Sequence, residues 1–476
     1  MPRKSSCRVG LNRGAVLSVL LATATPTLAG DAPTGAQSPP SVDAALAIDG
    51  VTVIDVESGR SVGPRTVVVD GGRIVAIARA RDLRIPANAR HLDGHGRFLI
   101  PGLVDMHVHL FNNASRRPPN DWAFPLFVAN GVTGVREMNV APASIPVVNQ
   151  WRASISNGEL IAPRILAAGV AAWGPSPADA TRQVDEAADA GADFIKVFSE
   201  VAAPEWNAIL EAAKRRGIPV AGHVPAGVSL LEAARAGQRS SEHLMQAFEA
   251  CSSVEAEMIA SRRGLDGDAL VARRDAQETR ALARFDRHRC QIVSRQLART
   301  GQVQVPTLVL TRILKEPGPD TDPRWKLLRG DERTRWQRNL SALTSQDDVL
   351  ERQRWRVARA IVSAMHHAGV PILAGTDSPM PKVYPGFSLH EELALLVQCG
   401  LTPLEALRSA TLAPARYLGI TTQAGSIAVG KRADLVLLDA DPLKDIRNTR
   451  RINAVVIGGR LLRRNDIDAL LAGAAR

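Results

Sequence analysis

Short apolar segments rich in β-branched residues recur along the middle of the chain, and a helical pattern of apolar residues follows each of them. A strand that is apolar on both faces is typical of a parallel sheet covered by helices, so this order predicts alternating strands and helices. Eight such units are expected to close into a TIM-type (β/α)8 barrel, which is an α/β fold. The predicted strands span 98–110, 131–138, 164–169, 193–198, 218–224, 238–244, 303–310 and 370–378.

Strict alternation of apolar and polar residues, interrupted by glycine turns, marks both flanks of this region. The stretches VVVDGGRIVAI and VVIGGR predict hairpins in which glycine supplies the positive φ angles. We expect the two flanks to pair in one small β-sandwich built from both ends of the chain. The predicted organisation is a first sandwich part over 45–98, the barrel over 99–418, and a second sandwich part with a C-terminal tail over 419–476.

Two intervals between predicted strands, 245–302 and 311–369, are too long for a single crossover helix. They follow the sixth and seventh strands and therefore emerge at the carboxyl end of the barrel, where substrates bind in this fold. Three roles stay open for these insertions: a lid, a contact in a homo-oligomer, or decoration without function.

The N-terminus has a different pattern. It begins with a basic segment that lacks acids, continues with a short apolar segment, and then has small residues around Ala29. This order is typical of a secretory signal peptide over 1–29, cleaved near Ala29 and followed by a flexible leader over 30–44. The apolar segment is too short for a stable membrane anchor, so we expect a secreted or periplasmic protein.

Composition and charge limit the classes of molecule that the protein is expected to bind. The chain of 476 residues has a formal net charge of +11, and removing residues 1–29 removes four cations and no acid, which leaves +7. Acids interrupt the remaining arginines and aromatic residues make up 4% of the chain, so we expect a small-molecule substrate and no nucleic-acid partner. Cys251, Cys290 and Cys399 lack the CxxC spacing of a thiolate metal site, and a Cys251–Cys290 disulfide is left open.

Residues of metal-binding type lie at the ends of the predicted strands. His107 and His109 are one residue apart in the first strand, so their side chains share a face and could bind one metal ion, although buried core histidines would give the same pattern. Further along the chain come Lys196 in the fourth strand, His223 at the end of the fifth, His243 at the end of the sixth and Asp377 at the end of the eighth. Catalytic groups gather at this end of a barrel, so we expect the six side chains to meet there.

With these motifs the chain resembles the metal-dependent amidohydrolase superfamily, in its imidazolonepropionase-like and prolidase-like branch. The motifs are PGLVDMHVHL, GVTGVREM, ADFIKVF, AGHV, SSEHL, AGTDS and GSIAVGKRADLVLLDADPL, and the resemblance covers essentially the whole chain after the leader. It implies two divalent cations, with zinc as the expected metal. The implied ligands are His107, His109 and Asp377 for one ion, His223 and His243 for the other, and a carbamate on Lys196 as the bridge between them.

The resemblance also implies a reaction. Asp377 would act as general base on a water activated by the metal ions, and the water would attack a carbonyl carbon. The expected activity is hydrolysis of a carbon–nitrogen bond in a small substrate such as a dipeptide, an N-acyl amino acid or a cyclic amide. Three alternatives remain: an ester or lactone hydrolase with the same metal site, a non-catalytic binding barrel, and a single-metal site in which Lys196 forms an ion pair.

The chain departs from dipeptidase-like relatives next to two of these residues. Pro225 stands two residues after His223, where those relatives carry a tyrosine, and the segment KVFSEV after the lysine lacks their Gly-Gly. The substrate-binding residues are therefore sought elsewhere. Arg136 could bind a substrate carboxylate or pair with Glu137 or another barrel acid, Tyr384 could replace the tyrosine or pack in its loop, and His390 lies at a predicted helix start.

Overall fold

The computed structural model describes residues 45–111, 119–313, 321–343 and 348–474, and the predicted signal peptide and leader lie outside them. A parallel sheet of seven strands, in the order β12-β11-β10-β9-β8-β7-β6, curves into a nearly closed barrel. Its strands are β6 (Leu103–Val108), β7 (Val132–Val140), β8 (Arg164–Ala171), β9 (Phe194–Val197), β10 (Val220–Gly222), β11 (Ser240–Glu242) and β12 (Val303–Val305). Each lies within or overlaps a predicted strand.

The predicted eighth strand closes the barrel without forming a regular strand. It makes single parallel bridges on both sides, Gln304↔Ile372 with β12 and Val108↔Ser378 with β6. The backbone N–H of Asp377 donates to the carbonyl of His107 at 2.8 Å. We refer to residues 370–378 as the closing segment.

The predicted first strand is divided in two at Gly102. Its first half, β5 (Phe98–Pro101), belongs to the flanking sheet, and its second half is β6 of the barrel. A Cβ atom on Gly102 would lie 2.1 Å from Oγ1 of Thr133, so only glycine fits at this crossing.

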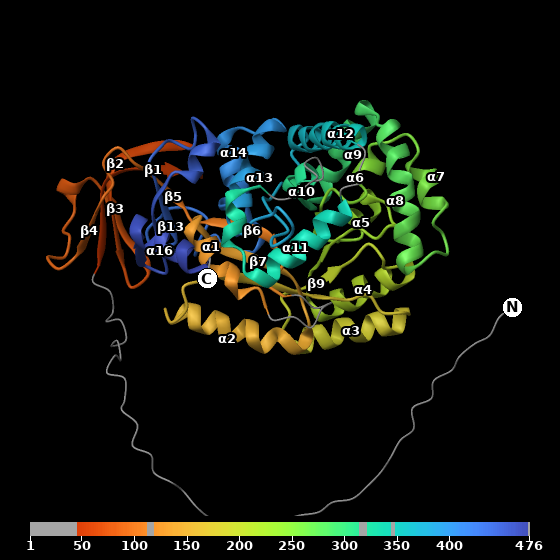
Figure 1. Ribbon diagram of the computed structural model, residues 1–476, viewed down its shortest axis with the longest axis horizontal. Coiled ribbons are helices and arrows are strands. Elements are labelled where there is room, and N and C mark those ends of the chain that lie inside the picture. The colour runs from red at the N-terminus through yellow and green to blue at the C-terminus, as the bar shows by residue number, and fades with distance from the viewer. Residues whose placement is uncertain (1–44, 112–118, 314–320, 344–347, 475–476) are drawn as a thin grey trace, which may run out of the picture. The chain divides into compact units, whose positions relative to one another are not determined.

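Helices cover the outside of the barrel, as Figure 1 shows. Two of them have sequence signals at their ends: Ser176 caps the N-terminus of α3, and α4 ends at Gly217 in the left-handed conformation (φ 67°). The outer helices are α1 (Phe124–Ala129), α2 (Ile145–Ser156), α3 (Pro177–Ala190), α4 (Ala203–Arg216), α5 (Leu230–Arg235), α9 (Arg287–Thr300), α12 (Asp348–His367), α13 (Phe387–Gln398), α14 (Pro403–Ser409) and α15 (Leu412–Tyr417). The insertions add α6 (Ala247–Ala250), α7 (Glu255–Ala260), α8 (Gly267–Ala283), α10 (Leu308–Ile313) and α11 (Gly330–Leu343).

Both flanks of the chain contribute to one separate mixed sheet, as predicted. Its order is β15-β14-β13-β5-β1-β2-β3, with β4 paired to β1, and β5 from the first flank pairs antiparallel with β13 from the second. Figure 1 shows β1–β5 beside β13 and α16 (Arg464–Ala474), a helix that the sequence analysis does not predict. The strands are β1 (Leu46–Asp55), β2 (Arg60–Asp70), β3 (Arg73–Ala78), β4 (Arg90–Asp93), β5, β13 (Leu435–Leu438), β14 (Ile452–Ile457) and β15 (Arg460–Arg463).

Two tight hairpins in this sheet turn on glycine pairs. Gly71 and Gly72 have φ angles of 53° and 73°, and Gly458 and Gly459 have φ angles of 57° and 86°. Two consecutive positive φ angles define the hairpin turn that matches the twist of antiparallel strands, so the prediction made from the GG dipeptides is confirmed. None of the helices in the described ranges is long and apolar enough to cross a bilayer.

A disulfide joins Cys251 and Cys290 and so settles the pairing that the sequence left open. It closes a loop of 39 residues around α7 and α8. Reduction is expected to lower the free energy of unfolding by about 2–4 kcal/mol, because the cross-link restricts the unfolded chain. Thermal denaturation with and without dithiothreitol measures the effect, and a Cys251→Ser/Cys290→Ser variant should be insensitive to the reductant. A wild-type melting temperature that does not change on reduction would contradict the expectation.

Candidate metal centre

The six side chains predicted to meet do lie together at the carboxyl end of the barrel. His107 is the fifth residue of β6, and Lys196 is the third residue of β9. The other four follow their strands directly or lie in the closing segment: His109 after β6, His223 after β10, His243 after β11, and Asp377. The parallel direction of the strands brings these ends to one mouth of the barrel.

Three of these residues form a compact group of potential metal ligands. Oδ1 of Asp377 lies 3.2 Å from Nε2 of His107 and 2.8 Å from Nε2 of His109. One ligand atom from each of the three residues lies within 4.8 Å of the others. Two imidazoles and a carboxylate are the ligand types that zinc prefers in catalytic sites.

The remaining residues adjoin this group. The ring centroids of His107 and His243 are 4.5 Å apart, and those of His243 and His223 are 5.0 Å apart. Phe198 contacts both Lys196 and His223: its ring centroid is 5.1 Å from Nζ of Lys196 and 5.2 Å from the ring centroid of His223. The six side chains therefore form one continuous cluster.

The buried polar atoms of the cluster fit a metal centre. Nε2 of His107, Nζ of Lys196 and Oδ1 of Asp377 are buried and make no hydrogen bond of suitable geometry within the described part of the chain, although Oδ1 lies close to the two Nε2 atoms. Burial without a hydrogen bond is costly for a polar atom, and coordination to a cation would satisfy these atoms. A Cβ on Gly222 would lie 2.7 Å from Cδ of Lys196, so this glycine makes room for the lysine side chain.

Hydrogen bonds to Nδ1 orient three of the imidazoles. Nδ1 of His107 lies 2.9 Å from a carboxylate oxygen of Glu242, and Nδ1 of His223 lies 3.1 Å from Oγ of Ser199. Nδ1 of His243 lies 2.8 Å from Oγ1 of Thr307, whose hydroxyl donates to the carbonyl of Pro306 and so accepts from the ring. Partners of this kind fix the tautomer that leaves Nε2 as the ligand atom.

Backbone conformation also sets this end of the barrel apart. His243, Thr307 and Asp377 have φ angles of 60°, 45° and 68°, which side-chain-bearing residues rarely adopt. Such conformations cost free energy and persist where the surrounding structure holds them, commonly at functional sites.

Burial favours the neutral form of Lys196, His223 and His243. It lowers the pKa of Lys196 to about 8 and, together with the charges of His107 and Lys196, the pKa of His243 to about 3. Burial and the charge of Lys196 hold the pKa of His223 well below its usual value. Neutral amines and imidazoles carry the lone pairs that metal coordination requires.

Asp377 is held as a carboxylate. Burial raises its pKa, but the imidazoles of His243, His109 and His107 outweigh this effect and bring the pKa well below its usual value. The same attraction raises the pKa of His109, against the effect of its own burial.

Two further buried carboxyl groups adjoin the cluster and were missed by sequence reasoning. Burial raises the pKa of both Asp105 and Glu137 to about 7. Asp105 accepts from the backbone N–H groups of His107 (3.2 Å) and Thr376 (3.0 Å) and so ties β6 to the closing segment. Glu137 accepts from the backbone N–H of Leu110. Glu137 lies near the carboxyl end of β7, and the same position on a barrel strand is what identified the other site residues in the sequence.

Arg136 is not placed to bind a substrate carboxylate. Its side chain is 0% exposed, its Nη2 donates to both carboxylate oxygens of Glu242 at 2.9 and 3.0 Å, and its Nε donates to the carbonyl of Met106 at 2.6 Å. The alternative of pairing with a barrel acid is what the structure shows, and the acid is Glu242 rather than Glu137. A buried guanidinium requires such a partner, so Arg136 forms its ion pair inside the barrel wall and does not face the cavity.

Tyr384 and His390 are also buried, each with 1% exposure. The ring of Tyr384 packs 5.2 Å from the ring of Trp336, and the guanidinium of Arg324 stacks on it at 4.5 Å. His390 lies in α13, where its two ring nitrogens are each 3.0 Å from an oxygen atom, of Thr449 and Asn130. Both side chains are enclosed in packing contacts, which agrees with the alternative that Tyr384 packs in its loop, and a substrate-binding role for either residue stays a prediction.

The cavity that opens on His243 has a volume of about 580 Å³. Its walls come mainly from the two insertions, which therefore shape the space beside the metal ligands rather than merely decorating the barrel. The lining residues are Leu244, Met245, Gln246, Phe248, Glu249, Arg274, Asp275, Glu278, Thr279, Ala281, Leu310, Thr311, Leu350, Glu351 and Arg354. It contains both apolar and charged side chains, as expected of a site for a small polar molecule.

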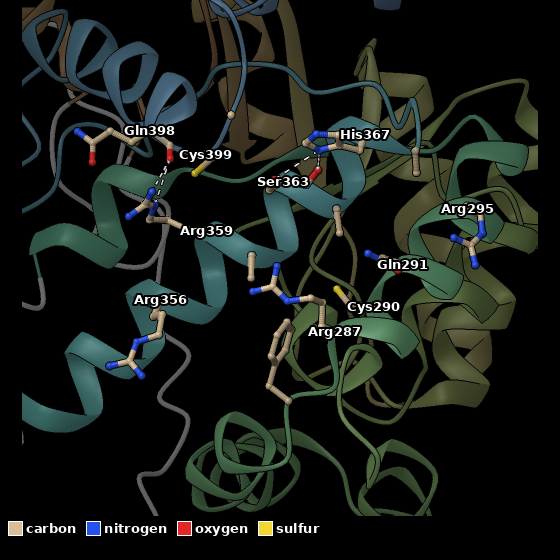
Figure 2. A pocket seen from close by; sticks show the side chains of 15 residues that line it. Arg287, Cys290, Gln291, Arg295, Arg356, Arg359, Ser363, His367, Gln398 and Cys399 are labelled. Atoms are coloured by element: carbon tan, nitrogen blue, oxygen red, sulfur yellow. Dashed lines mark hydrogen bonds between the residues drawn. The ribbon is translucent and has the colours of Figure 1, made fainter.

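A larger cavity of about 820 Å³ lies elsewhere, between α9, α12 and the end of α13 (Figure 2). None of the six clustered residues lines it, so it is separate from the candidate metal centre. Its cationic lining residues are Arg287, Arg295, Arg356, Arg359 and His367, and we call this cavity the arginine groove.

Comparison with known proteins agrees with this geometry. The model of the Amidohydrolase family matches residues 98–462, and the chain belongs to this family. An imidazolonepropionase from Sphingopyxis alaskensis is 28% identical over 403 residues, which cover 79% of this chain and 87% of that protein. In solved structures, a bottromycin amidohydrolase is similar with 26% identity, a TM-score of 0.67 and 90% of each chain covered. A candidate prolidase from Bifidobacterium longum shows 25% identity and a TM-score of 0.62 over 92% of this chain and 100% of the other.

Family membership identifies the protein as an enzyme, a metal-dependent hydrolase of carbon–nitrogen bonds. His107, His109 and Asp377 form its candidate metal site in the structure. Metal ions in such sites polarise a carbonyl group and activate water, which is the chemistry that amide hydrolysis requires.

The ion pair of Glu242 with Arg136 suggests a test of ligand positioning. A Glu242→Gln substitution keeps the size of the side chain but removes the charge that holds Nδ1–H of His107. We expect metal affinity to fall about 10–100-fold, the usual loss when a group that orients a metal-binding histidine is removed. Competition with a chromophoric chelator measures this affinity.

Glu249 offers a matched control. It lines the cavity that opens on His243 and, like Glu242, forms a buried ion pair with an arginine, Arg262, at 2.6 Å. Glu249→Gln is expected to lower stability, as loss of one partner of a buried pair does, but to leave metal affinity unchanged. Equal losses of metal affinity in the two variants would show that Glu242 acts only on overall stability.

Proposed function

We propose that this protein is an exported binuclear amidohydrolase that cleaves an amide or peptide bond in a small substrate such as a dipeptide, an N-acyl amino acid or a cyclic amide. The observation that carries the proposal is the cluster of four imidazoles, one buried amine and one carboxylate at the mouth of the barrel. The cavity beside His243 is of a size suited to such substrates. The similar bottromycin amidohydrolase is named for a reaction of this class.

In this proposal two divalent cations, with zinc as the expected metal, occupy the cluster. His107, His109 and Asp377 would hold one, and His223 and His243 the other. A carbamate on Lys196 would bridge them. The buried environment of Lys196 supports this role, because only the neutral amine reacts with carbon dioxide and burial favours the neutral form.

When bound, the metal ions supply Lewis-acid polarisation of the scissile carbonyl and a water of lowered pKa. The chain's own residues do the rest. Asp377, held as a carboxylate beside His107 and His109, accepts the proton of the attacking water and then donates it to the leaving nitrogen. Glu242, Ser199 and Thr307 hold the three imidazoles in place, so little reorganisation is needed during the reaction.

The signal peptide predicted over 1–29 makes export part of the proposal. The Cys251–Cys290 disulfide supports it, because structural disulfides persist mainly in oxidising compartments. We expect a soluble mature chain in the periplasm or the medium that begins near Ala29. N-terminal sequencing of the protein recovered from these fractions tests this expectation, and an intact N-terminus there would contradict it.

Substrate screening tests the proposed reaction. The metal-loaded protein is assayed against dipeptides, N-acyl amino acids and cyclic amides, each paired with the matching ester or lactone. We expect hydrolysis of at least one amide, and dependence on both metal ions, with about two per chain by elemental analysis. Hydrolysis confined to esters and lactones would overturn the assignment of the carbon–nitrogen bond.

A further inference from the structure

The arginine groove is a strongly cationic cavity that the catalytic proposal does not use. Figure 2 shows Arg287 extending from α9 toward α12, with Arg356, Arg359 and His367 spaced along α12. Gln291, Ser363 and Gln398 add polar groups to the wall, and no acidic residue is found among its lining residues in the described part of the chain. The groove therefore holds at least four positive charges and no compensating carboxylate.

Most of these charges are also unpartnered. The side chains of Arg287, Arg295 and Arg356 make no hydrogen bond or ion pair within the ranges that the structure describes, whereas Arg359 donates to the backbone carbonyl of Gln398 at 2.9 and 3.1 Å.

Neighbouring arginines on the same two helices behave differently. On α9, Arg289 pairs with Glu255 at 2.5 Å, and on α12, Arg354 pairs with Glu278 at 2.5 Å. Arg289 and Arg354 thus pair with acids of other elements, whereas none of the arginines that line the groove pairs with an acid in the described ranges.

The position of Arg287 adds a second observation. It is the first residue of α9, where the helix dipole presents its positive end and a cationic side chain is unfavourable. The carboxylate of Asp286 already caps this helix end, where it accepts from the backbone N–H of Arg289 at 2.9 Å, so a bound anion would be attracted mainly by the guanidinium. Cys290 lines the same wall and is fixed by its disulfide to Cys251, so the first turn of α9 is anchored.

The length of the groove indicates the kind of anion. From Arg287 to Arg295, α9 rises roughly 12 Å, and from Arg356 to His367, α12 rises roughly 16 Å. One tetrahedral anion can engage the forks of only one or two arginines, so cations spread over this length match several anionic groups. A cavity of about 820 Å³ also leaves room for the scaffold that carries them.

We propose that the arginine groove binds a soluble small molecule that carries two or more phosphate or sulfate ester groups. Its guanidinium groups match the tetrahedral oxyanions, and the absence of acids from the wall favours multiple negative charge. This site is independent of the metal centre and of the hydrolytic reaction.

Calorimetric titration of the metal-loaded protein tests the proposal with two probes, sucrose octasulfate and fructose 1,6-bisphosphate, which separate the sulfate from the phosphate source. We expect one site per chain for at least one probe, with affinity that decreases as salt increases. An Arg287→Gln/Arg356→Gln variant should bind at least about tenfold more weakly, because charged hydrogen bonds to two guanidinium groups are lost. Its melting temperature and metal content should not fall, since both side chains are unpartnered and Arg287 opposes the helix dipole.

Arg273 provides the matched control, because it is an exposed arginine on the neighbouring α8 that does not line the groove. Arg273→Gln should leave binding unchanged. Equal weakening in this control would show that only the net charge matters and would overturn the proposal, as would a wild-type protein that binds neither probe. Binding to phosphatidylglycerol vesicles without binding to either soluble probe would also overturn it, by assigning the groove to a membrane surface.

Discussion

Replacing Asp377 with asparagine is expected to lower kcat/KM by about 10²–10⁴-fold, the usual contribution of a general base. Asparagine has nearly the same size and keeps an oxygen that can coordinate a metal, but its amide cannot accept a proton from water. The carboxylate also attracts His107 and His109, at 3.2 and 2.8 Å, so some metal affinity will be lost with the charge. The loss of turnover should nevertheless greatly exceed the loss of metal.

Steady-state kinetics at saturating metal, combined with elemental analysis of the protein, separates the two effects. Asp70→Asn, at an exposed position at the end of β2, serves as a control for the loss of one negative charge. If Asp377→Asn retained near wild-type turnover with a full complement of metal, Asp377 would have no role in proton transfer.

If the site is binuclear as proposed, replacing Lys196 with alanine is expected to remove one metal ion and to lower kcat/KM by at least about 10²-fold, as the loss of one electrostatic group in an active site commonly does. The substitution would also leave a space beside His223 and the ring of Phe198. A short carboxylate such as acetate or propionate could occupy this space and replace the bridging carbamate in part. Elemental analysis and activity with and without the added acid measure both effects.

Lys196→Arg tests the carbamate itself. A guanidinium stays charged at any accessible pH and cannot form a carbamate, whereas burial lowers the pKa of Lys196 to about 8. As pH rises through this value the neutral amine becomes the main form, so carbamate formation should be favoured above pH 8 and disfavoured below it. The Lys196→Arg variant should therefore lose activity and metal as the Lys196→Ala variant does. Full activity and two metal ions in Lys196→Arg would mean that the residue acts as a cation.

The order of strands could be predicted because most barrel strands are apolar segments bounded by helices, although β11, with the sequence SSE, is polar. The closing segment was harder, since Pro371, Pro379 and the left-handed conformation of Asp377 prevent a regular strand there, even though the segment occupies the eighth position. The division of the first strand at Gly102 had no hydrophobic signal, because both halves are apolar. It follows from a tertiary contact with Thr133 that the local sequence does not specify.

The candidate metal ligands could be placed because one rule, polar residues at the carboxyl ends of barrel strands, applies to all of them. That rule does not distinguish a residue that faces the cavity from one that faces the barrel wall. Arg136 therefore looked available for substrate, although Glu242 binds it from β11. Residue type gave no information on burial for Tyr384 and His390, which the packing of α11, α13 and their neighbours encloses.

The cavity walls were the least predictable part of the site. They come from α6, α8, α10 and α12, whose positions depend on long-range packing between the two insertions. Arg354, for example, pairs with Glu278 on α8 from a position 76 residues later in the chain. Such pairs fix the shape of the cavity, and a single sequence gives no direct evidence of them.

The pairing of β5 with β13 has a consequence for biogenesis. Until residues 435–438 have been synthesised, β5 has no neighbour on the side away from β1, so the nascent chain carries an open strand edge through the synthesis of the whole barrel. Open edges are prone to intermolecular pairing. A ribosome that stalls or a protease that clips before β13 would therefore release a chain that self-associates, and premature termination should appear in cells as aggregate rather than as a soluble barrel.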